Sequence, residues 1–98
     1  MLTSKQRAFL RSKANAEAPV LHVGKGGISE SLLLQAEDAL TARELIKGKV
    51  LETAPLSSRE AAEQIAQAVH AEVVQVIGRT FVLYRRHPKE PKIQLPNG

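Results

Sequence analysis

The sequence predicts an α/β domain in the order α-β-α-β-α-β-β, with a four-stranded mixed sheet and helices packed on it. Helix-capping patterns followed by apolar residues at helical spacing occur three times. Four short runs rich in β-forming residues alternate with them, and only two residues separate the last two runs. A chain of 98 residues, 43% of them hydrophobic, is long enough for one core. We expect a single domain over residues 1–86 and a proline-containing tail over residues 87–98.

Each predicted helix begins after a side chain suited to cap its first turn. Two capping boxes and one N-cap serine are present: Thr3 with Gln6, Ser57 with Glu60, and Ser29. They predict helices over residues 4–16 and 30–42, and a third helix with apolar residues from Ala61 to Val69. The apolar stripe of the first helix consists of Phe9, Leu10 and Ala14.

The predicted strands cover residues 20–23, 44–53, 73–77 and 80–85. In the second strand, Ile46, Gly48 and Val50 share one face, with lysines on the other. Gly78 and Arg79 link the last two strands, and a two-residue linker with glycine first is typical of a type II′ hairpin turn. We expect right-handed β-α-β connections.

The charges are distributed unevenly along the chain, although the net charge is only +4. Residues 1–27 carry five basic and one acidic residue, residues 28–72 carry four basic and eight acidic, and residues 73–98 carry five basic and one acidic. Both ends are therefore basic and the middle is acidic. A fold that brings the ends together has one strongly positive face, which is typical of a polyanion-binding protein.

The composition argues against several functional classes. The chain has no cysteine, so it can form neither a disulfide nor a thiolate metal site. Its histidines, His22, His70 and His87, are scattered along the sequence, so we expect no bound metal and no other cofactor. No run reaches the about 18 apolar residues of a membrane helix, and the first residues do not resemble a signal peptide, so we expect a cytoplasmic protein. No nucleophile has a base and an orienting partner in a recognisable pattern, so neither an enzyme nor a small-molecule substrate is expected.

The sequence GKGG, formed by Gly24, Lys25, Gly26 and Gly27, is the sharpest local feature. It follows a predicted strand and precedes a predicted helix, where backbone N–H groups and a lysine favour phosphate. KH modules use a GxxG loop to clamp a nucleic-acid backbone. The alternative is a strand-to-helix turn in which glycine is required only for its geometry.

Aromatic residues are too few for an RRM, whose sheet stacks bases on exposed rings. The chain contains only Phe9, Phe81 and Tyr84. We expect both phenylalanines in the core and Tyr84 on a strand with its hydroxyl directed to solvent.

Five segments in order resemble the bacterial YhbY family, the stand-alone form of the CRM (chloroplast RNA splicing and ribosome maturation) domain. They are MLTSKQRAFLRSKA, VGKGGISESLL, ARELIKGKV, VVQVIGRTFVLYRR and KIQLP. The resemblance implies a fold similar to the C-terminal domain of bacterial translation initiation factor three, RNA binding, and association with precursors of the large ribosomal subunit. One departure is Gly48, where the resemblance leads us to expect a β-branched residue; glycine there leaves a gap or allows a neighbour to approach closely.

These observations lead to the hypothesis that the domain docks on ribosomal RNA during large-subunit assembly. The GKGG loop follows the RNA backbone and Lys25 contacts phosphate. The flanking positive charge comes from Lys5, Arg11, Lys13, Arg79 and Arg85, with Lys47 and Lys49 as further candidates. We expect a monomer.

Two alternatives belong to other functional classes. A protein-interaction module that reaches the ribosome through ribosomal proteins would use apolar tail residues such as Ile93 and Leu95 and bind naked RNA weakly. A small enzyme would use the loop for a nucleotide phosphate and be stabilised by nucleotides. A DNA-binding variant of the hypothesis is separated by comparing matched RNA and DNA, because only RNA offers the 2′-hydroxyl.

Overall fold

The computed structural model describes residues 2–97 and confirms the predicted order of elements. Met1 and Gly98, the outermost residues of the expected domain and tail, lie outside the described residues. The elements are α1 (Ser4–Ala14), β1 (Leu21–Val23), α2 (Glu30–Arg43), β2 (Leu45–Val50), α3 (Ser58–Val69), β3 (Glu72–Ile77) and β4 (Thr80–Tyr84).

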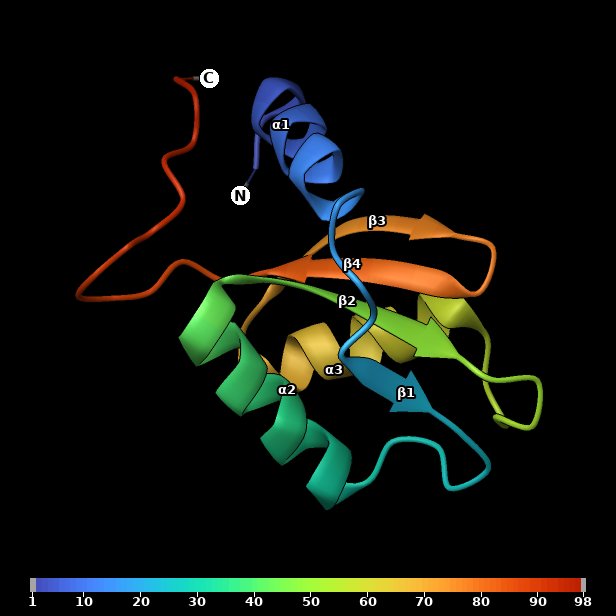
Figure 1. The fold of residues 1–98 in the computed structure, drawn as a ribbon. Coiled ribbons are helices and arrows are strands. Elements are labelled where there is room, and N and C mark those ends of the chain that lie inside the picture. The colour runs from blue at the N-terminus through green and yellow to red at the C-terminus, as the bar shows by residue number, and fades with distance from the viewer. Residues whose placement is uncertain (1, 98) are drawn as a thin grey trace.

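The four strands form one mixed sheet between two helical layers. Their order is β1-β2-β4-β3, with β1 and β2 parallel and the other two pairs antiparallel. Figure 1 shows α1 over one face of the sheet and α2 and α3 over the other. Within residues 2–97, no helix is both long and apolar enough to cross a membrane.

The capping residues act as the sequence predicts. Both capping boxes are complete, and the Ser29 side chain accepts a hydrogen bond from the Leu32 N–H. Gly78 has a φ of +56°, as the first residue of a type II′ turn requires. The main boundary differences are in the first helix, which ends at Ala14, and the second strand, which ends at Val50 opposite the last residue of β1. The second strand is shorter than predicted because its parallel partner ends there.

The sheet has one apolar cluster on each of its two faces. The larger cluster lies between the sheet and α2 and α3, and includes Leu21, Val23, Leu40, Ile46, Val50, Ile65, Phe81 and Leu83. The smaller cluster lies under α1 and contains Leu10, Ala14, Leu45, Val74, Val82 and Tyr84. The alternation of β2 and β4 places Ile46 and Leu83 in the first cluster and Leu45 and Val82 in the second. Both faces of the central strands therefore carry buried apolar residues.

One expectation for the aromatic residues is wrong. Phe9 is 36% exposed on α1 and does not belong to either cluster, because it lies a hundred degrees around the helix from Leu10, which faces the sheet. Tyr84 is only 4% exposed and packs in the smaller cluster, because the tail covers the end of β4. Burial raises the pKa of Tyr84, and the charge of Glu44 adds to this effect. Phe81 is in the core, as predicted.

The unexpected Gly48 is explained by its cross-strand neighbour. Gly48 and Phe81 are paired in the β2–β4 ladder. A Cβ atom on Gly48 would lie 2.2 Å from Phe81 Cζ, a distance that real contacts do not reach. The ring therefore occupies the space that a β-branched side chain would fill, and the two positions form one packing unit.

The tail is fastened to the domain by a buried carboxylate and by apolar contacts. Glu44 is 1% exposed, and its two carboxylate oxygens accept hydrogen bonds from the backbone N–H groups of His87, Lys92 and Ile93 at 2.6–2.8 Å. Ile93 and Leu95 pack against the smaller cluster. Burial raises the pKa of Glu44, but the three backbone N–H groups and the charge of His87 outweigh burial and lower it below 4.5.

The edge strand β3 contains an irregularity that α1 covers with an arginine. The β3–β4 register shifts between Val73 and Gln75, which leaves Val74 as the extra residue of a bulge. The Arg7 guanidinium donates hydrogen bonds to the carbonyl oxygens of Val73 and Val74.

We predict that Gly48→Val lowers the free energy of unfolding by about 1–3 kcal/mol, because the new side chain collides with the Phe81 ring. Phe81→Leu alone should also destabilise, since it leaves a cavity. The double variant should lose clearly less free energy of unfolding than the two single variants do together, because the smaller leucine makes room for valine. Urea unfolding measures all three. If the losses of stability in the two single variants simply add in the double variant, Gly48 and Phe81 do not pack as one unit.

We predict that Glu44→Gln lowers the free energy of detaching the tail from the domain by about 1–3 kcal/mol at neutral pH. The amide nitrogen of glutamine cannot accept a hydrogen bond from a backbone N–H group. Since the folded pKa of Glu44 is depressed, its stabilisation is complete above the ordinary value of 4.5 and is lost as the pH falls through the folded pKa. Protection factors of the His87, Lys92 and Ile93 amides, measured by hydrogen exchange, should fall on acidification in the wild type only. Wild-type protection in the variant would refute the role of this carboxylate.

Candidate nucleic-acid interface

The GKGG loop is a tight turn at the carboxyl end of β1. The Gly27 N–H donates a hydrogen bond to the Gly24 carbonyl oxygen at 2.9 Å, which brings Lys25 and Gly26 to the tip. Both tip residues are exposed. Among the hydrogen bonds formed within residues 2–97, none uses the backbone N–H of Lys25 or of Gly26. The tip therefore offers two amides and an ammonium group for an oxyanion.

The glycines of the loop have different structural requirements. Gly27 has a φ of +65°, which favours glycine, and a Cβ atom there would also lie close to Pro55, 3.2 Å from its Cγ. Gly26 has no atom within 4 Å of the corresponding position. The space over Gly26 is open, so a backbone from another molecule has room to approach there.

The loop does not lead directly into the helix. Ile28 and Ser29 separate it from α2, and the Ser29 side chain already accepts from an N–H group of the first turn. Glu30 adds negative charge at that helix end. A phosphate is therefore better placed on the turn itself than on the helix N-terminus.

Two other predicted cations lie at the same end of the sheet. Lys49 is paired with His22 on β1 and with Thr80 on β4. The Val50 N–H donates to the carbonyl oxygen of Arg79 in the β3–β4 hairpin. The Arg79 guanidinium lies 3.9 Å from Glu52 Oε1, an exposed pair of little strength. The GKGG loop, the end of β2 and the hairpin turn thus place Lys25, Lys49 and Arg79 at one end of the sheet.

A band of positive charge continues from this end to α1. Lys47 and Lys49 are on the sheet face that carries α1, and Lys47 lines a small hollow with Ala14 and Asn15 at the end of α1. We use the term basic strip for Lys5, Arg11, Lys13, Lys25, Lys47, Lys49 and Arg79. All of these residues are exposed except Lys47, which is half-buried.

The opposite helical layer has the opposite charge. Helix α1 contains four basic residues and no acidic residue, which gives +4. Helix α2 contains three acidic residues and one basic residue, and α3 contains two acidic residues and one basic residue, which together give −3. The sheet separates these layers, so the domain is electrostatically two-sided (Figure 1).

Arg85 is separated from the basic strip and is engaged within the protein. Its guanidinium donates to the Val69 carbonyl oxygen at the end of α3 and to Thr41 Oγ1, and it pairs with Glu37 Oε2. Its side chain is 21% exposed. The alternation of β4 places Arg85 on the side of α2 and α3, away from α1.

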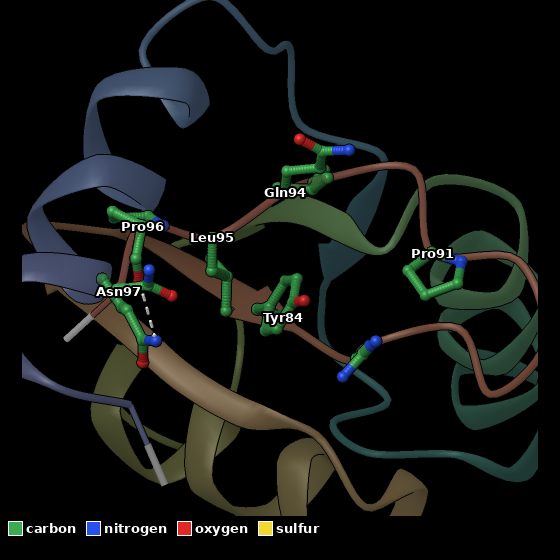
Figure 2. Close-up of a pocket in the computed structure, with 9 residues that line it drawn as sticks. Tyr84, Pro91, Gln94, Leu95, Pro96 and Asn97 are labelled. Atoms are coloured by element: carbon green, nitrogen blue, oxygen red, sulfur yellow. Dashed lines mark hydrogen bonds between the residues drawn. The ribbon is translucent and has the colours of Figure 1, made fainter.

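A hollow lies at the other end of the molecule, between the tail and β4. Its volume is about 530 Å³. Figure 2 shows the Tyr84 ring beside Leu95, with Pro91, Gln94, Pro96 and Asn97 of the tail around it. The Gln6 side-chain amide donates to the Pro96 carbonyl oxygen at 3.1 Å and ties the tail to α1. Burial raises the pKa of Tyr84, so its hydroxyl is not activated as a base.

The sequence reasoning missed two exposed side chains on the basic side. Phe9 was assigned to the core, although Lys5 and Lys13 stand four residues before and after it and indicate a solvent-facing row. His22 is exposed beside Lys49. Its position follows only from the parallel register of β1 and β2, which the sequence does not specify.

Comparison with known proteins places this architecture in a family. The model of the CRS1 / YhbY (CRM) domain matches residues 2–85. "Probable RNA-binding protein YqeI" from Bacillus subtilis is 43% identical over 96 residues, covering 98% of this chain and all of that protein. An "RNA-binding protein" from Haemophilus influenzae is 39% identical and covers 97% of this chain and 95% of its own length.

A solved structure agrees with these sequence matches. The solution structure of the hypothetical protein SAV1595 from Staphylococcus aureus, itself a candidate RNA-binding protein, superposes with a TM-score of 0.81. It is 44% identical, and the match covers 98% of this chain and all of that one. The fold is thus that of a small α/β domain of the CRM type. The chain belongs to the CRS1/YhbY family.

We predict that Arg85→Gln destabilises the fold by about 1–3 kcal/mol, because it leaves the Val69 carbonyl oxygen without its charged donor. The contribution of the partly exposed ion pair with Glu37 should be small, so Glu37→Gln should lose less. Urea unfolding of both variants provides the comparison. An Arg85 variant of unchanged stability would contradict this structural role.

Proposed function

We propose that this protein is a non-enzymatic RNA-binding domain that docks on ribosomal RNA of the large-subunit precursor and assists its assembly. The observation that carries the proposal is the two-sided charge, with the GKGG turn at one end of the basic strip. Relatives named as RNA-binding proteins over nearly their full length support the RNA partner.

The loop would hold the RNA backbone by the chemistry of its tip. The Lys25 ammonium and the tip amides bind phosphate oxygens, and the open space above Gly26 admits the backbone. Lys49 and Arg79 contact neighbouring phosphates. Such contacts fix position and orientation without reading base sequence, so discrimination between sequences should be modest.

The protein-interaction alternative loses part of its basis. Ile93 and Leu95, the apolar tail residues that it would use, are half-buried against the domain. RNA is therefore the better-supported partner.

We predict a steep salt dependence of RNA binding. If about five phosphates are contacted, single-strand counterion release gives a slope of log affinity against log salt near −3.5, or roughly a hundredfold loss from 50 to 200 mM. Lys25→Ala should make the slope shallower by about 0.7. Binding of purified protein to large-subunit ribosomal RNA fragments, with matched DNA alongside, tests this.

Two variants sharpen the measurement. Lys89→Ala removes the same charge from the exposed tail and should leave the slope unchanged. Gly26→Asp places negative charge at the tip without a steric conflict, whereas Gly27→Asp would strain the backbone. Weak, salt-independent binding, or equal effects of Lys25→Ala and Lys89→Ala, would refute docking through the loop.

A further inference from the structure

We propose that Phe9 is a stacking platform for an unpaired RNA base, with Lys5 and Lys13 binding the phosphates on either side. This inference rests on the proposed RNA-binding function and deepens it, because it names unpaired nucleotides as the class of RNA that α1 recognises. It assigns a binding role to a residue outside the GKGG loop.

Among the phenylalanine and tyrosine rings of residues 2–97, Phe9 is the exposed one. Phe81 and Tyr84 are buried in the two clusters, whereas Phe9 is 36% exposed. An exposed aromatic ring suits base stacking, since every base has a π-face and no sequence is required.

Two cations flank the ring along the helix. Lys5 and Lys13 are exposed and stand one turn before and one turn after Phe9. The Lys13 ammonium lies over the ring, 5.7 Å from its centroid. A base that stacks there takes the place of this ammonium, which can then bind the phosphate on that side while Lys5 binds the other.

A comparable exposed side chain on α2 shows why charge matters. Leu34 is 63% exposed, more than Phe9, but Glu30 and Asp38 stand four residues before and after it. Those carboxylates repel a nucleic-acid backbone. Of these two helical sites, the one on α1 combines exposure with charge complementary to RNA.

The neighbouring surface leaves space for the nucleotide strand. Ser12 and Lys13 line a shallow hollow together with Leu45, Ile93 and the ion-paired Arg43 and Glu17. This hollow begins within one helical turn of Phe9, so a strand leaving the ring has an open, partly apolar path.

The test compares Phe9 variants on a single-stranded oligoadenylate of about twelve nucleotides and on the same strand paired with oligouridylate. Phe9→Ala should weaken binding to the single strand roughly five- to tenfold, which is at the low end of the effects expected for losing one base–aromatic stack. It should change the affinity for the duplex little. Phe9→Tyr should keep the affinity. The salt slope should not change, because stacking releases no counterions. Leu34→Ala is the matched control and should bind as the wild type does.

A fluorescence measurement gives a direct reading of stacking. The chain contains no tryptophan, so Phe9→Trp introduces a single indole. The single strand should quench its emission and the duplex should not. Absence of quenching, with wild-type affinity in Phe9→Ala, would overturn the platform.

The outcomes separate this inference from the proposed function. A shallower salt slope in Lys25→Ala with no effect of Phe9→Ala keeps RNA docking and refutes the platform. No binding of wild-type protein to any RNA refutes both. Loss of binding to large-subunit particles but not to naked RNA in Phe9→Ala would mean that Phe9 contacts a protein, which also refutes the platform.

Discussion

The pairing of β2 with β4 is the constraint on which the rest of the structure depends. These central strands have apolar residues on both faces, so each face needs its own helical cover. The close approach of Phe81 to Gly48 sets the packing of this pair and fills the larger cluster. Because α1 covers one face and α2 and α3 the other, the sheet also separates the basic layer from the acidic layer. One packing arrangement thus determines both stability and charge distribution.

The sequence predicts the fold well because the signals for it are local. Capping boxes, helical spacing and the Gly78 turn each depend on a few adjacent residues, and all of them are found. The sequence also predicts the basic strip in part, since the excess charge lies at both ends of the chain. Helix and strand limits shift by a few residues, because they depend on where partners end.

The remaining features could not be predicted because they depend on contacts between distant residues. The sequence predicts Arg85 as a phosphate contact, but its side-chain partners lie on α2 and α3, 16 to 48 positions away. Glu44 holds a tail more than 40 residues further along the chain. The sequence indicates only that Gly48 leaves either a gap or room for a close neighbour. The register of the β2–β4 ladder shows that the neighbour is Phe81.

The bulge in β3 has a consequence for how copies of this chain meet. The outer strand of an open sheet is a template for further strands, and two such edges on different molecules tend to join. Here the Arg7 guanidinium donates hydrogen bonds to the carbonyl oxygens of Val73 and Val74. The extra residue of the bulge also bends the strand. A guanidinium placed over the edge thereby disfavours pairing of this strand with a strand from another copy.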